Sequence, residues 1–192
     1  MNITIFGGSF NPPTLGHQIV IKQTFELVKD IDQIWLLPDY QHSFAKNNDL
    51  APAADRLEMT KMLSSKKVKV ETCCLDQKMS GNTIEHITYL NKVHRGIRFS
   101  FLMGSDNLRT FTLWPEWQTL LHLMTFYIYP RAGFPLEPLH HNMMPLTHPL
   151  QIITNISSTL VRERIKQNLS WDQLVPADVA EYIRGKRLFL AA

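Results

Sequence analysis

Residues 2–17 read NITIFGGSFNPPTLGH, and this stretch decides the fold. Residues 3–5 are all β-branched and Phe6 is aromatic, which is typical of a buried strand, and the pair Gly7-Gly8 ends the strand in a tight turn. From Leu15 to Val28 apolar residues recur at helical spacing. A strand, a glycine turn and a helix in this order predict the first unit of a parallel α/β sheet, with an anion-binding site where the helix begins.

The same alternation continues along the chain. Strands are expected over residues 33–37, 67–71, 98–103, 125–129 and 151–153, and helices over 53–63, 83–93, 114–121, 157–167 and 176–184. Two stretches are expected to be loops: residues 40–50, and residues 130–149 with their five prolines. Strands that alternate with helices predict right-handed crossovers. We therefore expect one Rossmann-like, doubly wound α/β domain over residues 1–192, with a mostly parallel sheet and helices on both faces.

Composition narrows the class of protein. The chain has 192 residues, 44% hydrophobic and 19% charged, which suits one packed core and excludes disorder. No apolar run is long enough for a membrane span, and the net charge of +3 comes from dispersed residues. An RNA-binding module is the least favoured class, because no basic face or aromatic ladder is visible. Cys73 and Cys74 are adjacent and poorly placed for a disulfide, so we expect a cytoplasmic location.

The loop after the first strand carries the strongest functional signal. Gly7, Gly8 and Gly16 let the backbone approach a ligand closely, and the free amides of the helix start favour an anion. Thr14 and His17 lie three residues apart and share one helix face, so a hydroxyl and an imidazole can reach phosphate oxygens. The sequence contains neither Gly-x-Gly-x-x-Gly nor a Walker-type P-loop, which disfavours hydride-transfer enzymes and P-loop ATPases.

Three further segments carry polar or aromatic groups next to strand ends or helix starts. Residues 104–107, GSDN, follow a strand, and the carboxylate can accept hydrogen bonds from hydroxyl groups. Trp114, in residues 114–117, is suited to stacking on a flat ring. Residues 156–162, ISSTLVR, place hydroxyls and an arginine at a helix start, which suits an anionic group.

These motifs resemble a known family. GGSFNPP at residues 7–13, with Thr14-x-Gly16-His17, is similar to the opening of the nucleotidyltransferase superfamily that has the [His/Thr]-x-Gly-His motif. Within it, the chain resembles the bacterial nicotinate (nicotinamide) mononucleotide adenylyltransferases, and the resemblance extends over residues 3–189. It implies an enzyme of NAD biosynthesis that joins the AMP part of ATP to a pyridine mononucleotide and releases pyrophosphate, with Mg²⁺ on the phosphates.

The resemblance also implies a set of site residues. The catalytic residues would be His17 and Thr14. The ATP-binding residues would be Gly7, Gly8, Ser9, Phe10, Gly16, Gly104, Asp106, Ile156, Ser158, Thr159 and Arg162. The acceptor-binding residues would be His42, Lys46, Thr83, Asn107, Trp114 and Arg131. The expected partners are these small molecules, with no nucleic acid, no membrane and no protein-bound metal site; a homo-oligomer is left open.

Two departures from the family pattern bear on the substrate. Asn11 stands where an aspartate is commoner, and residues 38–46 read PDYQHSFAK where the family has Pro-Pro-His-Lys. The choice between nicotinate and nicotinamide mononucleotide therefore stays open. Two other functions also stay open: a related transferase that uses phosphopantetheine or a cytidine nucleotide, and a non-catalytic nucleotide-binding protein.

Overall fold

The computed structural model describes residues 1–41 and 50–190. Six strands form one sheet in the order β3-β2-β1-β4-β5-β6, and every neighbouring pair is parallel. The strands are β1 (Asn2–Gly8), β2 (Gln33–Pro38), β3 (Val68–Val70), β4 (Arg98–Gly104), β5 (Thr125–Tyr129) and β6 (Met143–Pro145). Strand order reverses between β1 and β4, which is the switch point of a doubly wound sheet. The predicted Rossmann-like fold is confirmed.

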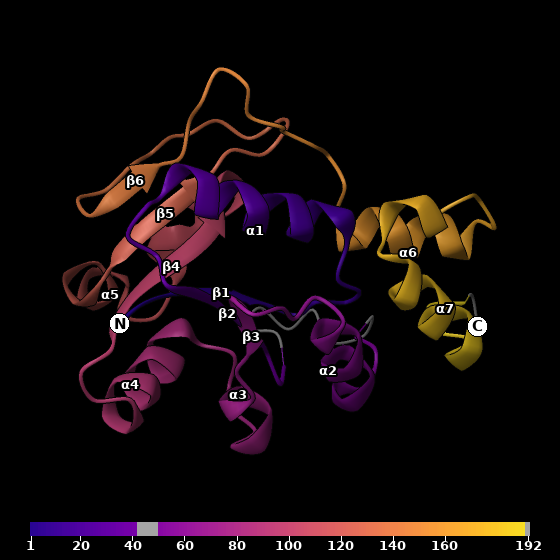
Figure 1. The fold of residues 1–192 in the computed structure, drawn as a ribbon, viewed down its shortest axis with the longest axis horizontal. Coiled ribbons are helices and arrows are strands. Elements are labelled where there is room, and N and C mark those ends of the chain that lie inside the picture. The colour runs from indigo at the N-terminus through magenta and orange to yellow at the C-terminus, as the bar shows by residue number, and fades with distance from the viewer. Residues whose placement is uncertain (42–49, 191–192) are drawn as a thin grey trace.

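Helices pack on both faces of the sheet, as expected. They are α1 (Leu15–Leu27), α2 (Ala53–Lys61), α3 (Cys73–Asp76), α4 (Thr83–Val93), α5 (Trp117–Leu123), α6 (Ser158–Lys166) and α7 (Ala177–Lys186), with 3₁₀ helices η1 (Ser105–Leu113) and η2 (Asp172–Leu174). Figure 1 shows α1 above the sheet and α3 and α4 below it. The strands alternate accordingly: Ile3 and Ile5 pack with α3, α4 and α5, whereas Ile34 and Leu36 pack with α1, α2, α6 and α7.

The last strand differs from the sequence prediction. The sixth strand is β6, within the segment that was expected to be a loop, and the strand predicted at residues 151–153 is wrong. Side chains satisfy the backbone there: Ile152 N–H donates to Gln23 Oε1 (3.0 Å), and Ile152 O accepts from Tyr129 Oη (2.7 Å). A backbone whose hydrogen bonds are met by side chains needs no strand partner.

A second difference concerns the segment after β4. The sequence predicted a helix over residues 114–121, but the chain first forms η1 and α5 begins only at Trp117. Glu116 adopts a left-handed conformation (φ 52°), which separates Trp114 from the helix. Trp114 therefore lies in a connecting segment at the carboxyl edge of the sheet, where ligands bind in such folds.

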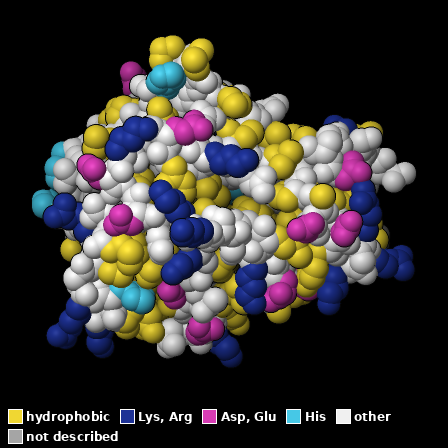
Figure 2. Space-filling view, viewed as in Figure 1, with side chains coloured by type: hydrophobic (Ala, Val, Ile, Leu, Met, Phe, Trp, Pro, Cys, Tyr) yellow, Lys and Arg dark blue, Asp and Glu magenta, His cyan; other side chains and the backbone are white. Residues whose placement is uncertain are grey.

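The molecular surface has mixed charge. Figure 2 shows Lys and Arg side chains interspersed with Asp and Glu on the face that it displays. None of the helices in residues 1–41 and 50–190 combines the length and apolar character that crossing a bilayer requires.

Candidate active site

A cavity of about 570 Å³ opens at the carboxyl edge of the sheet, where β1, β2, β4 and β5 end. The structure brings together most of the residues that the sequence predicted to bind ligands. The predicted residues on the cavity wall are Gly7, Gly8, Ser9, Thr14, Gly16, His17, Thr83, Gly104, Asp106, Asn107, Trp114, Arg131 and Ile156. Segments more than a hundred residues apart in the sequence therefore share one cavity at the switch point.

His17 is held in a defined tautomer at the start of α1. The backbone N–H of Thr14 donates to His17 Nδ1 (3.0 Å), and Thr14 Oγ1 lies 2.9 Å from the same nitrogen. A backbone amide can only donate, so Nδ1 must accept. The proton of the neutral imidazole is therefore on Nε2. Thr14 turns His17 into a hydrogen-bond donor at the cavity wall.

The surroundings of His17 keep its ring neutral and in place. Burial, and secondly the positive charge of Arg131, lower the pKa of His17 to about 4. The ring centroid of Phe10 lies 5.2 Å from that of His17, and that of Phe6 lies 5.7 Å away. At neutral pH the imidazole is therefore uncharged and offers its N–H from a fixed position. The positive charge next to it in the cavity is that of Arg131.

The first loop and the start of α6 are packed directly against each other. A Cβ atom on Gly16 would meet the backbone oxygen of Ile156 at 2.7 Å, so only glycine fits there. Ser158 Oγ donates to Pro12 O (2.7 Å), and Arg162 Nη1 donates to Asn11 O (2.9 Å). The two motifs are therefore packed against each other, and α6 supports the loop that carries Thr14 and His17.

Some predicted residues lie elsewhere. The described residues that form the cavity wall do not include Phe10, Ser158, Thr159 or Arg162. Phe10 is buried and packs on His17, and the side chains of Ser158 and Arg162 bind backbone oxygens of the first loop. His42 and Lys46 lie outside the described residues.

The ends of β4 and β5 form a second polar part of the wall. Asp106 Oδ1 lies 3.8 Å from Arg131 Nε, and this oxygen is buried with no hydrogen-bond partner among the described residues. Ser105 Oγ accepts from Arg131 N–H (3.0 Å) and donates to Phe134 O (2.9 Å), which fixes the backbone that carries Arg131. The side chains of Asp106 and Arg131 both lie against Gly104, where a Cβ atom would meet Arg131 Cδ at 2.6 Å. A carboxylate with a free oxygen beside a cation suits hydroxyl and phosphate groups.

Trp114 forms an aromatic part of the wall. Its ring packs edge-on against Phe101, with the ring centroids 6.1 Å apart. The centroid of the Phe111 ring lies 5.3 Å from that of Trp114. Its Nε1 is buried and has no hydrogen-bond partner in residues 1–41 and 50–190. A partly buried indole held in this way can stack on a flat ring and offer one N–H.

Three residues near the cavity were missed by the sequence analysis. Asp39 directly follows β2 and lines the cavity, a position that the carboxyl-end rule for parallel sheets could have found. His86 lines it one helical turn after Thr83. Arg56 of α2 is fully buried, and no sequence signal marks it. Its guanidinium donates to the backbone oxygens of Ala51 (3.1 Å), Ser9 (2.9 Å), Asp39 (2.6 Å) and Tyr40 (2.9 Å).

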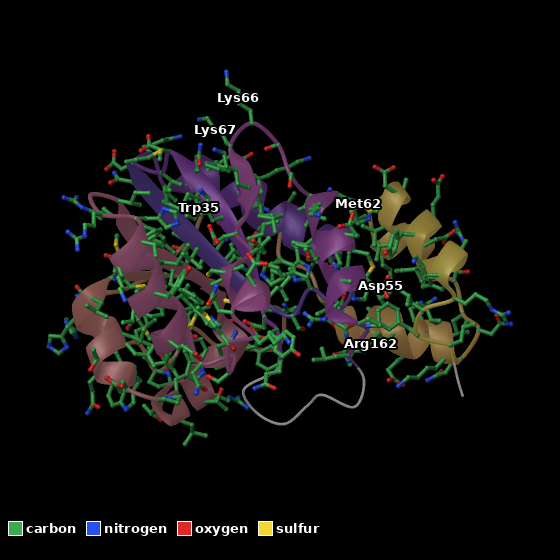
Figure 3. The ribbon with its side chains drawn as sticks, turned by 90° about the horizontal axis from the view of Figure 1, so that it is seen from below. Trp35, Asp55, Met62, Lys66, Lys67 and Arg162 are labelled. Atoms are coloured by element: carbon green, nitrogen blue, oxygen red, sulfur yellow. The ribbon has the colours of Figure 1, made fainter. Side chains whose placement is uncertain are left out.

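Arg56 and Asn11 explain how loops from different strands are joined. The four bonds of Arg56 tie the loop after β1 to the loop after β2. Asn11 is buried, and its Oδ1 accepts from Ala51 N–H (2.9 Å). An amide side chain at this position thus links the first loop to the segment before α2, and α2 is in turn joined to α7 by the bond from Tyr182 Oη to Asp55 (2.8 Å; Figure 3 labels Asp55).

Known proteins resemble this chain over most of its length. A family model described as cytidylyltransferase-like matches residues 5–164. A "Probable nicotinate-nucleotide adenylyltransferase" of Myxococcus xanthus is 31% identical over 98% of this chain and 95% of its own, and one of Halalkalibacterium halodurans is 29% identical over 97% and 90%. A solved structure described as the Plasmodium falciparum nicotinic acid mononucleotide adenylyltransferase complexed with NaAD superposes with a TM-score of 0.79 at 22% identity, over 98% of this chain and 97% of that one. The switch-point cavity, the Thr14-His17 pair and these relatives lead to one conclusion: the chain belongs to the nicotinate-nucleotide adenylyltransferase family, within the cytidylyltransferase-like proteins.

Proposed function

We propose that this chain transfers the AMP part of ATP to a pyridine mononucleotide, nicotinate or nicotinamide mononucleotide, and releases pyrophosphate. The observation that carries the proposal is His17, a neutral imidazole whose Nε2 proton is fixed by the Thr14 amide at the anion-binding start of α1. The names of the relatives in Myxococcus and Halalkalibacterium support the same activity.

The chemistry needs no nucleophile from the protein. An oxygen of the acceptor's phosphate, which is already ionised, attacks the α-phosphorus of ATP, and the bond to the bridging oxygen of the β-phosphate breaks. Pyrophosphate leaves with that electron pair. Catalysis is then orientation and stabilisation of charge on the α-phosphate, and His17 Nε2–H is the donor for that charge. The backbone of Gly7, Gly8 and Ser9 and the start of α1 receive the phosphates.

The rest of the cavity is divided between the two substrates. Asp106, beside Gly104, would bind the ribose of ATP, and Arg131 would neutralise phosphate charge. Trp114 would stack on the pyridine ring of the acceptor, with Thr83 and Asn107 nearby on the same wall. Ser158 and Arg162 would hold the β- and γ-phosphates after exchanging their present bonds to the first loop for bonds to ATP, and Thr159 would bind the phosphates beside them.

Mg²⁺ would enter with the nucleotide. No three His, Cys, Asp or Glu side chains gather to hold an ion within residues 1–41 and 50–190, and the carboxylates of the described cavity wall are Asp39 and Asp106. Such a sparse donor set fits an ion that is held mainly by phosphate oxygens and water. When bound, the ion would neutralise charge on the phosphates.

The test is incubation of the purified chain with ATP, Mg²⁺ and one mononucleotide at a time, followed by mass analysis of the products. The expected result is equal amounts of a dinucleotide and pyrophosphate. If pyrophosphate is released with phosphopantetheine or a cytidine nucleotide, and not with a pyridine mononucleotide, the chain is a related transferase that uses another substrate. Binding of ATP with no product from any acceptor would make it a non-catalytic nucleotide-binding protein.

A further inference from the structure

Two histidine side chains from separate elements meet on the surface, outside the cavity. His122 lies in the last turn of α5, and His141 lies in the turn before β6. The centroids of their rings are 5.3 Å apart, and the ring planes are inclined by 62°. Both residues are exposed, and neither is part of the described cavity wall. The proposed function therefore gives this pair no role.

The backbone of α5 determines which nitrogen of His122 is available to a ligand. Nδ1 of His122 lies 2.7 Å from the backbone oxygen of Gln118, one turn earlier in the helix. A carbonyl oxygen can only accept, so Nδ1 carries the proton and donates it. In the neutral ring, Nε2 then has a free lone pair. A histidine that binds a metal is held in the same way, with its second nitrogen donating to a carbonyl or carboxylate oxygen.

Hydrogen bonds hold the turn that carries His141 against α5. Nδ2 of Asn142 donates to Leu121 O (2.7 Å), and the N–H of Phe126 donates to Asn142 O (2.8 Å). Leu121 and Asn142 are the chain neighbours of the two histidines, so the fold itself sets the spacing of the pair. Figure 1 shows α5 and β6 at the same end of the molecule, away from α6 and α7. A ligand that binds between the two rings needs little reordering of the backbone.

The spacing of the rings matches two ligands of one tetrahedral ion. A Zn–N bond is about 2.0–2.1 Å long and the ring centre lies about 1.1 Å beyond the nitrogen, so each centroid would be about 3.2 Å from the ion. At a tetrahedral angle of about 109°, two such centroids are about 5.2 Å apart, close to the observed 5.3 Å. Neighbouring ligands of a square-planar ion would bring the centroids to about 4.5 Å. The spacing therefore favours Zn²⁺ over square-planar Cu²⁺.

We propose that His122 and His141 bind one Zn²⁺ ion, with Nε2 of His122 and one ring nitrogen of His141 as the protein ligands and water in the remaining positions. Within residues 1–41 and 50–190, no group of three or more His, Cys, Asp or Glu side chains is placed to hold a metal ion. The ion is therefore exchangeable, and it is held less tightly than one in a site with four protein ligands. This site lies beyond the proposed function and does not depend on it.

The ion would connect two segments that also carry cavity residues. α5 follows the segment that contains Trp114, and the turn with His141 ends the loop that begins after β5 with Arg131. The unfolded chain does not hold the two imidazoles at this spacing, so Zn²⁺ binds the folded chain preferentially and stabilises it. Its role is to support this end of the sheet, and no step of the proposed reaction needs it.

The experiment is calorimetric titration of the whole chain with ZnCl₂. The chain carries no histidine tag, is first treated with a chelator, and is free of nucleotide, because ATP would compete for the ion. We expect one Zn²⁺ per chain with a micromolar dissociation constant. His122→Gln and His141→Gln should each weaken binding by about tenfold or more, because each removes one of two protein ligands. Zn²⁺ should raise the Tm of the wild type and leave the Tm of both variants unchanged.

His148→Gln is the matched control. His148 is also an exposed histidine in a loop, but its Nδ1 accepts from Leu150 N–H (3.1 Å), and no second histidine ring contacts it among the described residues. This variant should bind Zn²⁺ as the wild type does. Thermal unfolding without Zn²⁺ should give the same Tm for all four proteins, which shows that the substitutions remove a ligand and leave the fold intact.

The outcomes decide whether the pair is a site. If either His122→Gln or His141→Gln binds Zn²⁺ with the affinity of the wild type, the ion is not held between the two rings and the inference is wrong. The absence of saturable binding to the wild type at micromolar to low millimolar Zn²⁺ would also overturn it. Neither result bears on the proposed function, which is tested separately by dinucleotide formation with Mg²⁺.

Discussion

At the scale of single residues, His17 shows how backbone geometry sets side-chain chemistry. The N–H of Thr14, at the start of α1, donates to Nδ1, so the ring proton is fixed on Nε2 without any acidic partner. A protonated ring could not accept that bond. The neutral state is therefore required by the fold as well as favoured by burial and by Arg131.

The first prediction concerns this donor. His17→Ala should lower kcat by about 100-fold or more with a smaller change in KM, because the lost hydrogen bond matters most when charge develops on the α-phosphate. Because the pKa of His17 is about 4, titration of this residue should not affect kcat between pH 6 and pH 8. Steady-state kinetics across that range provide the measurement. A kcat that falls with a pKa near 6.5 in the wild type, and no longer does so in His17→Gln, would contradict the neutral-donor role.

Arg56 carries the second prediction. Its guanidinium has four backbone oxygens as acceptors and joins the loops after β1 and β2. Arg56→Lys should destabilise the chain by about 3 kcal/mol, because an ammonium group cannot reproduce the planar fork and leaves buried oxygens unpaired. Urea unfolding measures the loss.

The control for Arg56 is Arg184→Lys, at an exposed ion pair with Asp172, where we expect a change within about 0.5 kcal/mol. Equal effects of the two substitutions would show that the buried guanidinium is not the link between the loops.

At the scale of elements, what the sequence predicted depended on local periodicity. The strand at 125–129 and the helix at 83–93 have the expected bounds, because apolar spacing and flanking turn residues determine both. The sixth strand was misplaced because pairing with β5 is a long-range choice, and the backbone of Ile152 is hydrogen-bonded by the side chains of Gln23 and Tyr129 instead. His86 was missed for a related reason. It lines the cavity next to Asp39, at the end of β2, and these two residues lie far apart in the sequence.

The third prediction tests the contact between two elements. Gly16→Ala should destabilise the chain by about 2 kcal/mol and lower kcat/KM about tenfold, because the added methyl group meets the Ile156 backbone and displaces the loop before α6. Gly185→Ala in α7 is the matched control, since its Cβ atom would meet nothing within 4 Å. It should stabilise the chain by about 0.5–1 kcal/mol, because alanine favours the helix. Thermal unfolding and kinetics of both variants decide whether Gly16 is required for close packing.

At the scale of the whole molecule, three groups around the cavity with strongly shifted pKa values contribute to the pH dependence of stability. The pKa values of His17 and His86 fall from 6.5 to about 4 on folding, so between pH 6.5 and pH 4 the unfolded chain binds these two protons and the folded chain does not. The pKa of Asp39 rises from 3.8 to about 7, so in the same window the folded chain holds one proton that the unfolded chain lacks. As the pH falls through this window, the two histidines lower the free energy of unfolding, and Asp39 raises it.

The fourth prediction follows from the sum of these groups. Two protons against one leave the unfolded chain with about one extra bound proton, so the free energy of unfolding should fall by about 1 kcal/mol from pH 6 to pH 5. In the double variant His17→Gln/His86→Gln only Asp39 remains, and the sign should reverse, with greater stability at pH 5. Urea unfolding of both proteins without ligands measures the slopes. A wild type that is more stable at pH 5 would mean that the cavity does not hold both rings neutral, and the fixed Nε2 donor of His17 would lose its basis.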